Sequence, residues 1–326
     1  MPIQVPRITL REVKEARERV NGIITRTPLV PASRFEQGRT HLKLECLQPT
    51  GSFKVRGAWN RMSRSSADEV RRGFVTVSAG NHGQAVAWCA RRLGATCTVY
   101  VPDDAVQRKV DSMQSMGATL VRRPHQEIMQ SMTDDRMSSL GMTFIHPFAD
   151  PRVVAGQGTI GLEILDDLPD VASVVVPVGG GGLVSGIAQA IKSLKPTTKI
   201  YGVQAEGAAP LPKSLRSGRS EDVGDPKTIA DGIGATMTYD YMLPLLRENL
   251  ESAFTVSDEE MLRAMRELMY ESHVFAEPAG AASLAAARKH AAELEEPVVC
   301  VVSGGNADPG LVAGLLTPEK PSQGRA

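Results

Sequence analysis

The sequence predicts an α/β fold built from mostly parallel sheets. Short apolar segments rich in β-branched residues alternate with segments of helical periodicity along the chain. The run from Val174 to Val178 is continuously apolar, as a strand buried on both faces of a parallel sheet must be. Glycine-rich turns follow three of the expected strands. Because parallel strands need crossover connections, this alternation indicates helices on the faces of the sheets.

The first half of the chain carries its expected elements in alternation. Residues 9–21 have the pattern of an amphipathic helix, in which Thr9 is the N-cap and Glu12 completes a capping box. Another helix begins near Lys54, because Gly51 permits a tight turn and Ser52 can cap. The other expected strands are 42–47, 74–77, 95–102, 118–121 and 142–147, and the other helices are 84–93 and 107–116.

The second half repeats the pattern. Four glycines follow the buried strand at 174–178 and precede a helix at 183–194. Residues 214–228 are rich in glycine, proline and charge, which indicates a long loop. The remaining expected strands are 199–205 and 297–302, and the remaining helices are 257–271 and 280–295.

The composition argues against several classes of protein. The chain has 326 residues, enough for two domains. Its 37 basic and 37 acidic side chains balance, which argues against nucleic-acid and membrane-surface partners. No apolar run approaches the roughly 20 residues that span a bilayer. The chain has four cysteines, Cys46, Cys89, Cys97 and Cys300, and none stands at metal-ligand spacing. We expect them to be reduced and mostly buried, as in a cytoplasmic protein.

The run Gly179-Gly180-Gly181-Gly182 predicts a phosphate site. Without side chains, successive backbone N–H groups can converge on one anion, and the following helix adds a favourable dipole. The alternative is a dinucleotide site, with Glu206 at the end of the next strand as the ribose ligand. The dinucleotide glycine pattern does not fit, because its third glycine would fall on Val184 or Ser185. A nicotinamide-dependent oxidoreductase is therefore the second hypothesis.

Two more strand ends carry polar groups suited to a ligand. In residues 78–83, free amides can hold a carboxylate and Asn81 can donate to a phenolate, although Ser78 or Asn81 could instead cap a helix. In residues 303–306, the Ser303 hydroxyl can meet a heterocyclic nitrogen. Lys54, partly desolvated at a helix start, can act as a nucleophile or base. Ligands of α/β proteins gather where strands end, so these groups are expected to meet.

Together these residues resemble the fold-type II pyridoxal-phosphate enzymes, in the branch of serine/threonine dehydratases and serine racemases. The resemblance runs from about Leu10 to Asp308. It implies two open, mostly parallel sheets flanked by helices, as in the tryptophan synthase β subunit. The motifs that carry it are residues 52–58, 78–84, 155–159, 179–182, 229–232 and 303–306.

The resemblance implies a role for each cofactor-binding residue. Lys54 matches the lysine that holds pyridoxal phosphate as a Schiff base, and Phe53 packs beside its ring. Asn81 is expected to bind the phenolic oxygen, and Ser303 the pyridine nitrogen. The phosphate is expected at Gly179, Gly180, Gly181 and Gly182.

The substrate side is implied in the same way. The substrate carboxylate is expected at the amides of Ser78, Ala79, Gly80, Asn81 and His82, with the Gly232 backbone lining the site. Of these, the His82 side chain is expected to be structural.

A further hypothesis concerns two basic residues. Arg123 or His125 would face a second carboxylate on a less usual substrate, although a solvated basic turn explains them as well.

The implied activity is that of an ammonia-lyase. Such an enzyme eliminates the β-hydroxyl of a 3-hydroxy amino acid, such as L-threonine, L-serine or 3-hydroxyaspartate, to give a 2-oxo acid and ammonia. An amino acid racemase with the same cofactor is the alternative, but racemases have a serine where this chain has Ala79. No metal is expected, because Pro212 replaces the second acid of the family's cation site near Glu206.

The resemblance also implies the organisation of the molecule. Residues 1–66 and 151–326 would form a large cofactor-binding domain, and residues 67–150 a small mobile domain. We expect a homodimer acting on a small amino acid, with no nucleic-acid or membrane partner. Only twenty residues follow Asn306, so no C-terminal effector-binding domain is expected.

Overall fold

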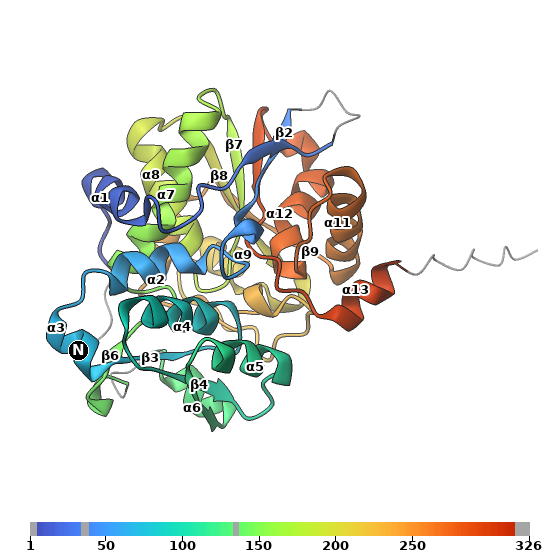
Figure 1. Cartoon of the computed structure of the whole chain (residues 1–326). Coiled ribbons are helices and arrows are strands. Elements are labelled where there is room, and N and C mark those ends of the chain that lie inside the picture. The colour runs from blue at the N-terminus through green and yellow to red at the C-terminus, as the bar shows by residue number, and fades with distance from the viewer. Residues whose placement is uncertain (1–4, 34–38, 133–136, 317–326) are drawn as a thin grey trace, which may run out of the picture.

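A computed structural model describes residues 5–33, 39–132 and 137–316, which form two sheets (Figure 1). The larger sheet has six strands in the order β1-β2-β10-β7-β8-β9. All its neighbouring strands are parallel except β1 and β2. In sheet order they are β1 (Leu29–Pro31), β2 (Thr40–Lys43), β10 (Val298–Val301), β7 (Ser173–Pro177), β8 (Lys199–Ala205) and β9 (Ser252–Val256).

Helices cover both faces of the six-stranded sheet. Alternate residues of β7 point to opposite faces, so Val174 and Val176 pack in one core and Val175 in the other. The first core includes α1 (Leu10–Val20), α7 (Pro151–Asp167), α8 (Gly182–Leu194), α9 (Pro210–Ser217) and α10 (Leu243–Asn249). The second includes α11 (Asp258–Glu271), α12 (Pro278–Lys289) and α13 (Pro309–Leu316).

The smaller sheet is four-stranded and wholly parallel, in the order β5-β4-β3-β6. Its strands are β3 (Phe74–Val77), β4 (Cys97–Pro102), β5 (Thr119–Arg123) and β6 (Thr143–Phe144). Helices α4 (Asn81–Leu93) and α5 (Gln107–Ser115) pack in one core, and α6 (His125–Gln130) in another. A short helix, α3 (Ala67–Arg72), precedes β3. Helix α2 (Lys54–Met62) lies between the two sheets and joins the core of α4 (Figure 1).

Most expected elements are present, but several bounds were wrong. The strand predicted at 42–47 ends at Lys43, and Glu45–Leu47 form a 3-10 helix that turns the buried Glu45 toward Arg56. Helix α4 begins at Asn81 rather than at residue 84. Ser52 does not cap α2; its hydroxyl is buried and has no hydrogen-bond partner among the described residues. Neither Ser78 nor Asn81 caps α4, whose N-cap is Gly80.

Helix α7 is the main element that the sequence analysis did not predict. Its glycines allow close packing against α2 and α8. A Cβ on Gly156 would lie 2.6 Å from the Cα of Gly57, and one on Gly158 would lie 3.0 Å from the carbonyl oxygen of Gly186. Three helices therefore meet without side chains between their backbones.

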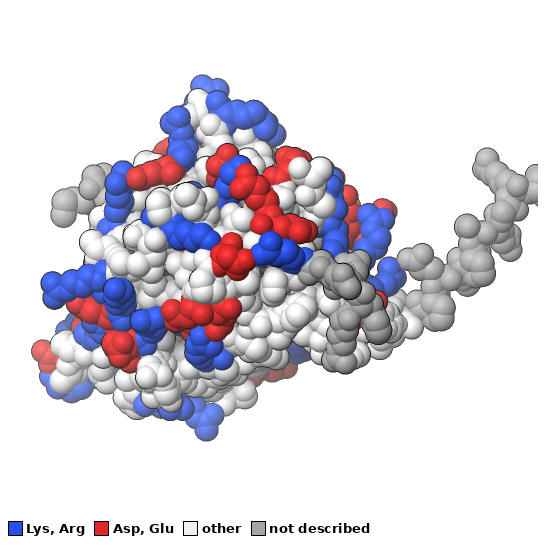
Figure 2. All heavy atoms as spheres, turned by 90° about the horizontal axis from the view of Figure 1, so that it is seen from above, with Lys and Arg blue, Asp and Glu red and all other residues white. Residues whose placement is uncertain are grey.

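The surface agrees with a balanced composition. Basic and acidic side chains are interspersed over the face shown in Figure 2. Among the described helices, none is long and apolar enough to span a membrane. The four cysteines are buried and free, as expected.

Candidate active site

The site is a cavity between the two sheets, at the carboxyl ends of β3, β7 and β10. Its main chamber has a volume of about 270 Å³, and a smaller pocket of about 40 Å³ lies beside it under the glycine turn. Every residue predicted for the site lines one or both of these spaces. They are Phe53, Lys54, Ser78, Ala79, Gly80, Asn81, His82, Gly179, Gly180, Gly181, Gly182, Gly232 and Ser303.

Lys54 enters the cavity from the first residue of α2. Gly51, at φ +70°, makes the turn that precedes this helix, and a Cβ there would lie 2.5 Å from Asn306 Oδ1. The Lys54 ammonium Nζ donates to the carbonyl oxygen of Pro147 at 3.0 Å and lies 5.3 Å from the centre of the Phe53 ring. Burial in the cavity disfavours the charged amine and lowers the pKa of Lys54 to about 8. The neutral amine, which is the form that acts as a nucleophile or base, is therefore more populated near neutral pH than in a solvated lysine.

The two histidines nearest to Lys54 are uncharged. Burial lowers the pKa of His82 to about 3 and that of His146 to about 4. His146 Nδ1 accepts from the backbone N–H groups of Phe148 and Ala149, at 3.2 and 2.9 Å, so it carries no proton. These contacts agree with a structural role for the His82 and His146 rings, which add no positive charge beside the lysine.

The four-glycine turn forms a cradle that only glycines fit. It connects β7 to α8, and Gly181 has φ +92°. A Cβ on Gly180 would lie 2.4 Å from the Phe148 ring, and one on Gly182 would lie 2.8 Å from the Phe148 carbonyl oxygen. The N-terminal amides of α8 have no acceptors within the helix, so the turn suits an anion such as phosphate.

Polar side chains reach the cavity from the other strand ends. The Ser303 hydroxyl lies 3.5 Å from the carbonyl oxygen of Ala279, a long hydrogen bond that leaves it available to a ligand. The Asn81 amide Nδ2 donates to Glu277 Oε1 at 2.6 Å, and Asn306 Nδ2 donates to Asn81 Oδ1 at 2.8 Å. Burial raises the pKa of Glu277 to about 7.

Several residues of the cavity wall escaped the sequence analysis, among them Lys109, Phe148, Tyr239 and Glu277. Only Glu277 carried a visible signal, since it directly precedes the Pro-Ala-Gly start of α12. Conversely, Arg123 and His125 are not among the cavity-lining residues. The Arg123 guanidinium lies 5.6 Å from the centre of the Tyr100 ring and 3.9 Å from Glu127. The basic side chain that does reach the cavity from this part of the chain is Lys109, which pairs with Asp231.

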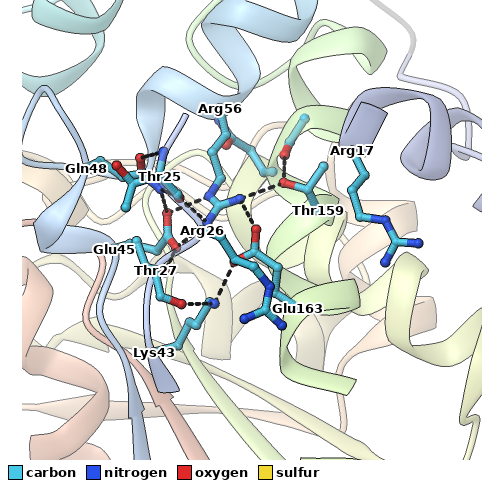
Figure 3. Close-up of polar contacts among 12 residues, drawn as sticks. Arg17, Thr25, Arg26, Thr27, Lys43, Glu45, Gln48, Arg56, Thr159 and Glu163 are labelled. Carbon is cyan, nitrogen blue, oxygen red and sulfur yellow. Dashed lines mark hydrogen bonds and ion pairs between the residues drawn. The ribbon is translucent and has the colours of Figure 1, made fainter. Parts of the chain in front are cut away.

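A buried ion cluster, formed by Arg56, Glu45, Glu163 and Lys43, anchors the helix that carries Lys54 (Figure 3). The Arg56 guanidinium makes two bonds to Glu45, at 2.7 and 2.8 Å, and two to Glu163, at 2.7 and 2.9 Å. Lys43 Nζ donates to Glu163 at 2.6 Å. The two cations balance the two carboxylates, and Arg56 lies only two residues beyond Lys54. The cluster therefore fixes α2 against β2 and α7.

Glu206 is engaged elsewhere. Its carboxylate accepts from Lys289 at 2.9 Å at the end of β8. Within the described ranges, no group of three or more histidine, cysteine or acidic side chains is arranged to hold a metal. Pro212 lies in α9.

Known proteins resemble the chain over nearly its whole length. It is 40% identical over 324 residues to an L-threonine ammonia-lyase of Thermotoga maritima, covering 98% of this chain and 80% of that protein. It is 36% identical to a catabolic L-threonine dehydratase of Staphylococcus aureus, covering 95% and 92% of the two chains.

Solved structures resemble it as well. A threonine deaminase from T.th. superposes with a TM-score of 0.86 at 37% identity, covering 92% of this chain and 99% of that one. Maize serine racemase superposes with a TM-score of 0.88 at 30% identity, covering 95% and 97%. The family model described as pyridoxal-phosphate dependent enzyme matches residues 20–304, which replaces the nicotinamide hypothesis. The chain therefore belongs to the family of pyridoxal-phosphate-dependent enzymes.

Proposed function

We propose that this chain is an ammonia-lyase that converts L-threonine, and L-serine as a shorter substrate, into a 2-oxo acid and ammonia. The observation that carries this proposal is one juxtaposition: the buried amine of Lys54 and the four-glycine turn line the same pocket. The relatives named threonine ammonia-lyase or dehydratase, at 36 to 40% identity over most of the chain, support the choice of reaction.

The residues present fit the cofactor pyridoxal phosphate. The cradle that excludes any Cβ at Gly180 and Gly182 suits its phosphate, and the available Ser303 hydroxyl suits a ring nitrogen. Lys54 would hold its aldehyde carbon, Asn81 its phenolic oxygen, and Phe53 would pack on the ring. When bound, the cofactor supplies an electron sink for the charge that develops at the substrate Cα.

The chain's own groups then bind and orient the amino acid. The first-turn amides of α4 have no acceptors within the helix, so they suit the substrate carboxylate. Lys54 Nζ, with its lowered pKa, is the group placed to take the Cα proton, a role typically worth about 10²–10⁴-fold in rate. Burial lowers the pKa values of His82 and His146, so these rings are weak bases that do not compete with Lys54 for that proton.

The side chain of the substrate meets an apolar wall. Met129, Met132, Phe148 and Tyr239 line the cavity, and the Phe148 and Tyr239 rings lie 5.0 Å apart. Burial raises the pKa of Tyr239 to about 12, so its hydroxyl stays neutral. Such a wall suits the methyl group of threonine better than a second carboxylate, which supports L-threonine over 3-hydroxyaspartate.

Racemisation with the same cofactor is the second candidate. Structural neighbours named serine racemase, at 30 and 34% identity, favour it. Ala79 argues against it, because a methyl group at this cavity position cannot transfer a proton.

The decisive experiment measures products from three substrates. Purified protein loaded with pyridoxal phosphate is incubated with L-threonine, L-serine and 3-hydroxyaspartate stereoisomers, and 2-oxo acid release and product chirality are followed. We expect the fastest release from L-threonine, little D-serine from L-serine, and no release by Lys54→Ala. Formation of D-amino acid without 2-oxo acid would instead establish the racemase.

We also propose the organisation of the chain in the cell. Residues 67–150, which contain the four-stranded sheet, would form a small mobile domain on a large domain of residues 1–66 and 151–326. A homodimer is supported by two large apolar side chains, Leu47 and Phe275, which are 52% and 56% exposed. A cytoplasmic location is supported by the four free cysteines. Sedimentation of Phe275→Glu beside the wild type tests the dimer, since the variant should sediment as a monomer.

A further inference from the structure

The Asn81 carboxamide is held at both of its polar atoms. Its oxygen accepts from Asn306 Nδ2 at 2.8 Å, and its nitrogen donates to Glu277 Oε1 at 2.6 Å. Asn306 is itself anchored, because its Nδ2 also donates to the carbonyl oxygen of Thr50 at 2.9 Å. An amide has two donor hydrogens and one acceptor oxygen, so these partners decide which end of Asn81 donates. One hydrogen of Nδ2 goes to Glu277, and the other remains for a ligand in the cavity that Asn81 lines.

Glu277 occupies a place shaped to receive it. Only 4% of the residue is exposed. A Cβ on Gly304 would lie 2.2 Å from Glu277 Oε1, so the turn after β10 leaves room for this carboxylate. The backbone N–H of Glu277 donates to the Gly304 carbonyl oxygen at 3.0 Å, and a Cβ on Gly280 would lie 2.2 Å from that same oxygen. The start of α12 and the turn at residues 303–306 are thus fitted around one buried carboxyl group.

Burying a carboxyl group costs free energy unless partners stabilise it. Burial and the nearby carboxylate of Asp231 both disfavour its charged form, while Asn81 and Lys109 favour it. Lys109 pairs with Asp231 and not with Glu277. Among the described residues, Asn81 is the only one whose side chain is bonded to the Glu277 carboxyl group. The binding and proton-transfer roles proposed above leave Glu277 without a function.

We propose that Glu277 is a positioning residue that acts through Asn81. By accepting from Nδ2, it fixes the carboxamide so that the free N–H faces the phenolic oxygen of the cofactor. Asn306 secures the same orientation from the other side. The proposal rests on the role proposed for Asn81. It explains why the turn at residues 303–306 contains both Asn306, which bonds Asn81, and Gly304, which makes room for Glu277.

The test compares cofactor binding to the full-length apoprotein in a double-mutant cycle. The variants are Glu277→Met, which keeps the volume but cannot accept, Asn81→Ala, and the two combined; Glu277→Gln keeps an acceptor oxygen. Affinity for pyridoxal phosphate and the absorption maximum of the bound form are measured by titration. We expect Glu277→Met to weaken binding roughly tenfold and to shift the maximum. Glu277→Gln should retain most of both properties.

The cycle separates action through Asn81 from a general effect on the fold. In the Asn81→Ala background, Glu277→Met should have little further effect on affinity or on the maximum. Effects that add independently would overturn the proposal, as would a Glu277→Met protein with wild-type affinity and absorption. Glu260→Gln, a carboxylate of α11 that bonds Ser257 and Lys289, is the matched control and should leave both readouts unchanged.

The same titration distinguishes failure of the proposed function. If wild-type protein binds pyridoxal phosphate and Lys54→Ala abolishes the absorption band, the cofactor role stands whatever Glu277 does. If Glu277→Met does not fold, Glu277→Gln and Asn306→Ala decide the matter. Asn306→Ala should then shift the maximum and Glu277→Gln should not, and the reverse result would overturn the proposal.

Discussion

Burial shifts the pKa values of four groups of the cavity toward their neutral forms. Lys54 loses its proton more readily than a solvated lysine, His82 and His146 remain neutral, and Glu277 holds its proton to higher pH. Each shift has the same cause, because a low-dielectric wall disfavours the charged form of any acid or base. The Lys54 amine is therefore deprotonated more easily than that of a solvated lysine, and the two nearby histidines stay uncharged.

Ala79 is the position at which the type of reaction should change. We expect Ala79→Ser to raise the rate of D-serine formation from L-serine, by up to roughly 10²-fold, because it adds a proton-transferring hydroxyl to the cavity wall. Ala79→Val adds volume without such a group and serves as the control. Chiral chromatography of the amino acid pool measures the change. If both variants behave alike, the residue does not decide between elimination and racemisation.

Glu277 should make stability depend on pH. Its pKa is raised from 4.5 to about 7 in the folded chain, so between these values the unfolded chain has lost the proton that the folded chain retains. The wild-type apoprotein should therefore lose stability relative to Glu277→Gln as the pH rises through this window, by at most about 1.4 kcal/mol per pH unit. Urea denaturation of both proteins from pH 5 to 8 measures the difference. A difference independent of pH would show that Glu277 is not neutral at low pH in the folded state.

At the scale of elements, three helices meet through glycine. Gly57 of α2, Gly156 of α7 and Gly186 of α8 let the backbones approach where side chains would keep them apart. The ion cluster of Arg56 and Glu163 bridges the same pair of helices, α2 and α7. The amine of Lys54 is thus placed by a contact between backbones, which gives its helix little freedom to shift.

Gly156→Ala tests this contact. The added Cβ would lie 2.6 Å from Gly57 Cα and 2.7 Å from the Arg56 carbonyl oxygen, so α2 and α7 must separate. We expect a loss of roughly 1–3 kcal/mol in the free energy of unfolding, measured by urea denaturation. Gly314→Ala in α13, where a Cβ meets nothing within 4 Å, is the control and should be neutral or stabilising.

Strands and helices of this fold show where prediction from sequence succeeds and where it fails. The strands at 74–77 and 199–205 have the predicted bounds, because their apolar residues and flanking turns are local signals. Helix α7 was missed because Gly156, Gly158 and Gly161 lower its helix propensity, and the neighbours that need them are far away in sequence. The predicted strand at 42–47 was too long for a similar reason. Glu45 pairs with Arg56, which also pairs with Glu163, and these contacts are not visible in a local sequence pattern.

The candidate site was more predictable than its surroundings. Glycine-rich turns after strands can be recognised from the sequence, and the fold brings them to one place because parallel strands end at a common edge. Lys109 and Phe148 lie outside such turns, and only the tertiary structure brings them to the cavity. Their assignment requires knowing how the two sheets face each other.

At the scale of the whole molecule, a few polar contacts tie the two sheets together across the cavity. Lys109 of α5 pairs with Asp231, the Tyr241 hydroxyl donates to the Met132 carbonyl oxygen at 3.0 Å, and Arg108 donates to the Ala307 carbonyl oxygen at 2.7 Å. These bonds are few beside the apolar cores on either side. A ligand in the cavity would lie beside one of these contacts, because Lys109 and Asp231 both line the cavity.

Lys109→Met should separate a role of this side chain in substrate binding from its contribution to stability. Asp231 is 60% exposed, so loss of the pair should lower the free energy of unfolding by less than about 1 kcal/mol. Because the Lys109 side chain lies beside Gly80, at the expected carboxylate site, KM for L-threonine should rise roughly fivefold with kcat nearly unchanged. Lys289→Met removes the ion pairs to Glu206 and Glu260, and Lys289 is not among the cavity-lining residues, so this variant should leave KM unchanged. An equal rise in KM for both variants would exclude a local role for Lys109.

The order of strands has a consequence for how the chain is made. β10, the last strand in the described sequence, occupies the middle of the six-stranded sheet, between β2 and β7. β2 ends at Lys43 and β10 begins at Val298, so during translation β2 lacks this neighbour until more than 250 further residues have been synthesised. The four-stranded sheet comes from one continuous stretch and can close much earlier. During translation the nascent protein therefore exposes unpaired β-edges, which makes chaperone protection most valuable until β10 has been synthesised.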